Sequence, residues 1–72
     1  MKKLSPRTTE IVTMVGRDGL DWQAVGSALQ ISRSTIMAHV HRAMARHGLA
    51  NRKPREACVA LYLTIVVRYA DA

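Results

Sequence analysis

Residues 21–48, with the sequence DWQAVGSALQISRSTIMAHVHRAMARHG, decide the fold predicted for this chain. Apolar residues recur every three or four positions on both sides of a short break at residues 30–32, which is the spacing of two amphipathic helices. Asp21 can cap the first helix, and Ser32 can cap the second by accepting a hydrogen bond from an amide two or three residues further on. The stretch therefore predicts two helices joined by a tight turn, a helix-turn-helix.

Two more helices are predicted outside this motif. Ser5 can cap a helix over about residues 6–17, whose first residue is a proline. A last helix is expected over about residues 54–69, although its β-branched residues 64–67 lower helix propensity and make a strand the competing prediction there. The expected fold is all-α, with four helices in one domain that takes in residues 1–72.

The chain is strongly basic, with 11 Lys and Arg residues against 5 Asp and Glu residues and a net charge of +6. Between residues 31 and 55 there is no acidic residue, while six lysines and arginines and all three histidines fall there. Such clustering of one sign is typical of a surface that faces phosphates, and a solvated basic face is the alternative. Double-stranded DNA is the partner that this composition favours.

Several other function classes are disfavoured. Cys58 is the only cysteine, so no intramolecular disulfide is expected, and His39 and His41 point apart on a helix, so no metal site is expected either. The apolar run at residues 57–67 is shorter than the roughly 20 residues of a membrane span, and no secretory signal is recognised. We expect a cytoplasmic protein without membrane contact, cofactor or small-molecule ligand. No nucleophile–base pair, phosphate loop or paired carboxylate suggests an enzyme.

The outward side of the second motif helix, over about residues 33–47, carries the candidate base-reading residues. Ile36 lies at the centre of the expected inward side, with Val40 and Ala43 beside it. His41 and Arg42 can donate to guanine acceptors in the major groove, and methyl-bearing side chains can pack on thymine. The predicted base contacts are Ser34, Met37, Ala38, His41 and Arg42.

A second set of side chains is suited to the phosphate backbone, which adds affinity but carries no sequence information. His39 lies at the edge of the inward side, so we expect a hydrogen-bonded histidine at the border of the core, and a hydrogen bond to phosphate is the alternative. The predicted phosphate contacts are Ser32, Arg33, Thr35, Arg46, Arg52 and Lys53, with Arg55 as a further candidate.

The last helix is apolar almost all round. One small core cannot use both of its sides, so one side is expected to pack on the other helices and the opposite side on a second protomer. The predicted dimer interface consists of Cys58, Leu61, Tyr62, Ile65, Val66 and Tyr69.

The order of short motifs along residues 4–69 resembles the LuxR/FixJ/GerE-type helix-turn-helix domain. The motifs are LSPR at 4–7, EIV at 10–12, GLD at 19–21, ISRSTI at 31–36 and GL at 48–49. The resemblance implies a four-helix DNA-binding domain whose third helix enters the major groove and whose last helix pairs protomers on a two-fold-symmetric site. It places groove contacts at Met37, Ala38 and His41, and backbone contacts around Asp21, Gln23, Ser32, Thr35 and Arg52.

These observations predict a stand-alone, sequence-specific transcription regulator. We expect a homodimer on a palindromic site with half-sites about one helical turn, ~10 bp, apart, and 72 residues leave no room for a sensing domain. The alternative is a protein-interaction module. It would form heterodimers with larger regulators or, because HVHRAMARHG at residues 39–48 also resembles region four of sigma factors, contact RNA polymerase.

Overall fold

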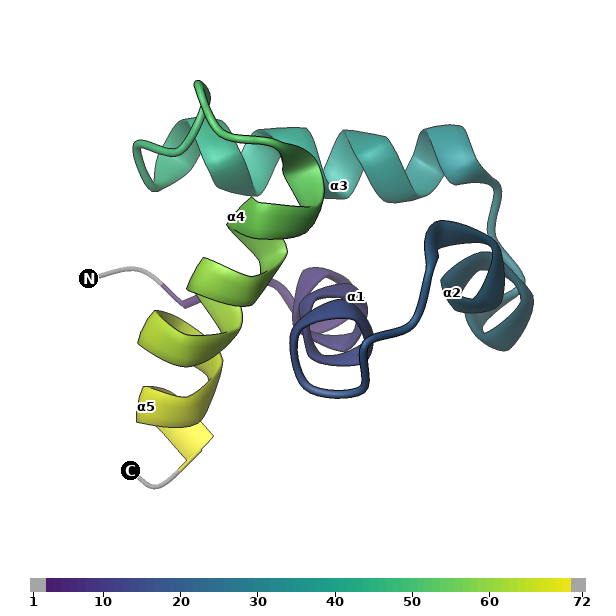
Figure 1. Ribbon diagram of the computed structural model, residues 1–72, viewed down its shortest axis with the longest axis horizontal. Helices are drawn as coiled ribbons and strands as arrows, with labels where there is room; N and C mark the ends of the chain where they lie inside the picture. Colours follow the sequence, from purple (N-terminus) through teal and green to yellow (C-terminus); the bar gives the residue numbers. More distant parts are fainter. Residues whose placement is uncertain (1–2, 71–72) are drawn as a thin grey trace.

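The computed structural model of the chain describes residues 3–70, and the side chains of residues 3–68. This part of the chain is helical throughout, without a strand, as the sequence predicts (Figure 1). The elements are α1 (Pro6–Gly16), α2 (Trp22–Leu29), α3 (Arg33–Arg46), α4 (Pro54–Leu61), a π-helical segment η1 (Tyr62–Val66) and α5 (Val67–Ala70). The last three elements follow one another without a break and are together called the C-terminal helix. The strand considered for residues 64–67 is wrong.

Side-chain caps fix the beginnings of the first three helices. Each cap accepts a hydrogen bond from the amide three residues further on, at 3.3 Å for Ser5, 2.8 Å for Asp21 and 3.2 Å for Ser32. At the end of α2, Gln30 has φ 56°, in the left-handed region that reverses the chain direction. All three predicted caps are confirmed, so local side-chain chemistry sets these helix boundaries.

The helix α1 lies at the centre of the molecule. It packs against α2, α3, α4 and η1, while α3 crosses over it and the C-terminal helix runs down from α3 (Figure 1). Every helix contributes to one apolar core, which contains Ile11, Val12, Val15, Val25, Ile36, Val40, Ala43, Met44, Ala57, Cys58, Leu61 and Ile65. Because α1 supports both α3 and the C-terminal helix, the core fixes the orientation of α3.

The β-branched run of the C-terminal helix widens the helix and does not unwind it. The amide of Val67 donates to the carbonyl of Tyr62, five residues earlier, which is the π-helical pattern. Thr64 adds a hydrogen bond from its Oγ1 to the carbonyl of Ala60 at 2.7 Å. No helix within residues 3–70 is both long enough and apolar enough to cross a membrane.

The predicted dimer interface requires correction. Cys58, Leu61 and Ile65 are only 0, 1 and 4% exposed within the single chain, so they belong to its own core and offer no surface to a partner. Tyr62 and Val66 are half-buried against this core, and the side chain of Tyr69 lies outside the described residues. The apolar side chains of this helix that do reach solvent are Val59, Leu63 and Val67.

The burial of Cys58 gives the stability of the fold a dependence on alkaline pH. Burial raises the pKa of its thiol to about 11, with a smaller opposing effect from Arg55. In the unfolded chain a cysteine thiol ionises at about pH 8.5. The contribution of the protonated, buried thiol to the free energy of unfolding is therefore complete below that pH, and it is lost as the pH rises towards 11.

We therefore expect the free energy of unfolding to fall between pH 8 and pH 11, measured by urea denaturation at a series of pH values. Cys58→Ala removes this thiol and should show a smaller fall over the same range. An equal fall in both proteins would contradict the assignment to Cys58.

Candidate nucleic-acid interface

The turn between α2 and α3 is held tight by a close backbone approach. A Cβ atom at Gly26 would lie 2.9 Å from the carbonyl oxygen of Ile31, a separation that real Cβ atoms do not adopt. The amide of Ile31 donates to the carbonyl of Gly26 at 3.1 Å. A residue without a side chain at this position therefore lets α3 leave the turn at the observed angle.

One side of α3 is buried and the other faces solvent. Ile36, Val40, Ala43 and Met44 are in the core, which confirms the inward side expected from the sequence. In Figure 1, α3 lies along one edge of the molecule, and the loop before α4 lies beside its C-terminal half.

Most of the predicted base-contact residues lie on this outer side. Ser34, Ala38, His41 and Arg42 are exposed, and Met37 is half-buried and packs against the core. The Nε of Arg42 donates to the carbonyl of Ala38 at 3.3 Å, which holds the arginine stem along the helix. The outer side of α3 therefore presents small, hydroxyl, imidazole and guanidinium groups together, and we call these five residues the reading face.

Hydroxyl groups gather at the N-terminal end of α3. The Oγ of Ser32 lies 3.2 Å from the Oγ of Ser34 and 3.0 Å from the Oγ1 of Thr35, and it also accepts from the Thr35 amide. All three residues are exposed. The Oγ of Ser32 therefore caps the helix, and the hydroxyl groups of Ser34 and Thr35 lie exposed beside it at the helix end.

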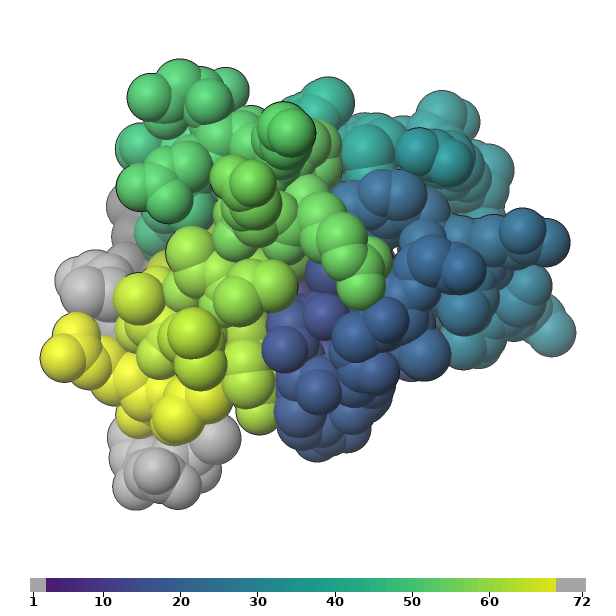
Figure 2. Space-filling model, viewed as in Figure 1, coloured from purple at the N-terminus to yellow at the C-terminus, as the bar shows by residue number. Residues whose placement is uncertain are grey.

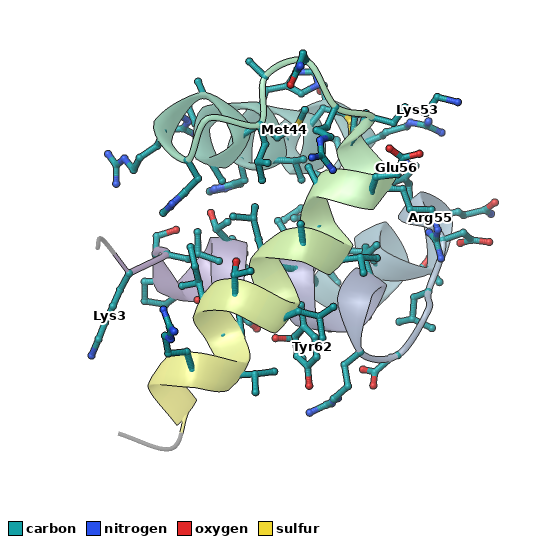
Figure 3. All side chains as sticks on the ribbon, turned by 60° about the vertical axis from the view of Figure 1, so that its left-hand side comes forward. Lys3, Met44, Lys53, Arg55, Glu56 and Tyr62 are labelled. Carbon is teal, nitrogen blue, oxygen red and sulfur yellow. The ribbon has the colours of Figure 1, made fainter. Side chains whose placement is uncertain are left out.

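Exposed cations flank the reading face. Arg33 and Arg46 stand at the two ends of α3, while Arg52 and Lys53 belong to the loop before α4 (Figure 3 labels Lys53). The ion pairs found within residues 3–70 involve Arg7 with Glu10 and Arg17 with Asp18, on other parts of the molecule. The charges around α3 are therefore not neutralised by these carboxylates.

Arg55 has a structural contact that the sequence did not reveal. Its Nη1 donates to the carbonyl of Leu20 at 2.9 Å and its Nη2 to the carbonyl of Gly19 at 3.0 Å (Figure 3). The guanidinium thus ties the start of α4 to the α1–α2 loop. No local sequence pattern links residues 35 positions apart, so only the tertiary structure could show this pair.

His39 occupies the border of the core, as expected. Its ring is half-buried, and its Nδ1 lies 3.4 Å from the Oγ1 of the buried Thr8. Within residues 3–70 no three His, Cys, Asp or Glu side chains come together in an arrangement that could hold a metal ion.

The geometry of α2, the turn and α3 defines the class of protein: a helix-turn-helix DNA-binding domain. The family model described as Sigma-70, region 4 matches residues 1–46, which is 46 of the 72 residues and takes in all of α1, α2 and α3. The chain belongs to this family. The finer LuxR/GerE assignment is not confirmed by this match. No curated protein and no solved structure matches the chain.

Proposed function

We propose that this chain is a sequence-specific transcription regulator that inserts α3 into the major groove of duplex DNA. The observation that carries the proposal is the exposed reading face on a helix held by the helix-turn-helix, with exposed cations at both ends of that helix and in the loop that follows it. An α-helix fits the major groove, where each base pair presents its own pattern of donors and acceptors. The proposal assigns the chain no enzymatic activity, cofactor or small-molecule ligand, and a cytoplasmic location stays a prediction.

The proposal divides the exposed residues by role. His41 and Arg42 donate to base edges, and the small Ala38 and the exposed Ala45 let the helix axis come close to them. Arg33, Arg52 and Lys53 contact phosphates, which gives affinity without sequence preference. Met37 contributes only the part of its side chain that is not packed against the core.

Recognition of a palindrome requires a second copy of the chain. We propose that two copies meet through the exposed apolar side chains Val59, Leu63 and Val67, which lie four residues apart along the C-terminal helix. Figure 2 shows the outer side of this helix forming the surface of the molecule beside the end of α1. This arrangement replaces the interface predicted from the buried residues of the same helix. The two recognition helices would then contact half-sites ~10 bp apart.

The experiment is selection of bound fragments from random duplex DNA, followed by binding titrations with three variants. His41→Ala should change which base is preferred at one position in each half-site, because each good base contact gives about 1–3 kcal/mol of discrimination. Arg52→Ala should weaken all sequences alike and lower the slope of log affinity against log salt by about 0.9. Arg68→Ala, an exposed charge change in α5, is the matched control and should have neither effect. Equal loss on all sequences from His41→Ala would contradict its base-reading role.

A second candidate function is contact with RNA polymerase, which the family favours. The two functions differ in the residues they need. If His41→Ala with Arg42→Ala abolishes function in a transcription assay, DNA reading is required. If the same double variant keeps full activity and Leu63→Glu abolishes it, the interaction role replaces the first proposal.

A further inference from the structure

An open hollow of about 260 Å³ lies between the beginning of α1 and the second half of α3. The beginning of the described chain and the end of α3 lie on the same side of the molecule (Figure 1). A water molecule takes about 30 Å³ of liquid volume, so the space exceeds that of several waters. The lining residues are Lys3, Leu4, Ser5, Thr8, His39, Arg42, Ala43 and Arg46.

Among residues 3–68, the charged side chains that line the hollow are all cationic. They are Lys3, Arg42 and Arg46. The carboxylates of Glu10 and Asp18 pair with arginines elsewhere in the structure. Within residues 3–68, neither Arg42 nor Arg46 forms an ion pair. Arg42 and Arg46 therefore make the α3 side of the hollow electropositive, which favours an anion there.

Hydrogen bonds on the inner wall position the ring of His39. The Oγ of Ser5 donates to the Oγ1 of Thr8 at 2.9 Å, and the Oγ1 of Thr8 lies 3.4 Å from the Nδ1 of His39. One ring nitrogen is thus engaged with Thr8, and the same ring lines the hollow.

We propose that this hollow binds a phosphate group, through the charges of Arg42 and Arg46 and a hydrogen bond from the ring of His39. Arginine forks and neutral N–H groups are the donors that phosphate oxygens accept from in proteins. Resting on the proposed function, the group would be a DNA backbone phosphate, because Arg42 joins the hollow to the reading face and the phosphate backbones border the major groove. Free inorganic phosphate offers the same chemistry and is the other source.

Two variants separate the roles of charge and hydrogen bond. Arg46→Gln removes one charge and should lower the salt slope of duplex DNA binding by about 0.9. His39→Phe removes both ring nitrogens while keeping a ring of similar size, so affinity should fall about tenfold with the salt slope unchanged. Arg68→Gln lies outside the hollow and serves as the matched control for charge. Thermal unfolding by circular dichroism checks that each variant is folded.

The source of the phosphate is decided by titrating the protein with inorganic phosphate and following the His39 ring resonances by NMR. If phosphate shifts these resonances saturably and Arg46→Gln weakens this binding, the ligand of the hollow is free phosphate. If phosphate causes no shift but Arg46→Gln and His39→Phe change DNA binding as expected, the ligand is a phosphate of the DNA backbone. If the wild type binds duplex DNA, both variants bind like the control and phosphate gives no saturable shift, the inference is overturned while the proposed function stands. If phosphate binds the hollow and duplex DNA does not bind at all, the proposed function fails and the inference stands.

Discussion

Ile65→Glu should unfold this chain, whereas Leu63→Glu, two residues earlier on the same helix, should leave it folded. Ile65 is 4% exposed within the core, and Leu63 is 62% exposed. A carboxylate placed at the first position loses its hydration without a partner, and the cost exceeds about 4 kcal/mol. The total stability expected of 72 residues is only about 4–11 kcal/mol, so this single change removes a large part or all of it.

The measurement is thermal unfolding by circular dichroism, combined with the elution volume on size exclusion. The Ile65→Glu protein should already be unfolded at 25 °C and should show no cooperative unfolding transition on heating. Leu63→Glu should unfold within a few degrees of the wild type, and it should elute later if two copies pair through Val59, Leu63 and Val67 as proposed. A folded Ile65→Glu protein that elutes as a monomer would restore the interface originally predicted for this residue.

Gly16→Ala should destabilise the fold by about 1–3 kcal/mol, the usual cost of overpacking. The reason is the crossing of α1 over the C-terminal helix. A Cβ at Gly16 would lie 2.6 Å from the Cβ of Tyr62 and 3.2 Å from the carbonyl oxygen of Cys58. Figure 3 shows Tyr62 on the side of the C-terminal helix that faces the end of α1. The two helices would have to separate to admit one methyl group.

The test is whether Gly16→Ala lowers or raises the free energy of unfolding, because a change from glycine to alanine inside a helix ordinarily raises it by about 1 kcal/mol. Urea denaturation gives the free energy of unfolding, and Ser27→Ala, at an exposed site of α2, is the matched helical control with little expected change. A Gly16→Ala protein as stable as the wild type would show that α1 and η1 do not approach as closely as described.

The positions of the helices could be predicted because the signals that set them are local. A cap acts on an amide three residues away, and the inward side of α3 follows from a repeat that is visible over a few turns. The exposure of Ser34, Ala38, His41 and Arg42 then follows from the placement of Ile36 inward.

The C-terminal helix shows where such reasoning stops. Its residues are apolar almost all round, so the sequence pattern does not distinguish the side that packs inward. The close approach of Gly16 to Tyr62 and the packing of α1 against η1 make Leu61 and Ile65 core residues and leave Leu63 in solvent.

The sequence by itself determined the four helical segments, the turn at residues 30–32 and the cationic stretch of residues 31–55 that contains no acidic residue. These properties arise from hydrogen bonds, periodicity and charge within short stretches of chain. The tertiary structure alone decided which side of the C-terminal helix is buried, that Arg55 binds the carbonyls of Gly19 and Leu20, and that His39, Arg42 and Arg46 face the start of α1 across one hollow. Each of these depends on contacts between segments far apart in the chain, which form only when the helices pack on a common core.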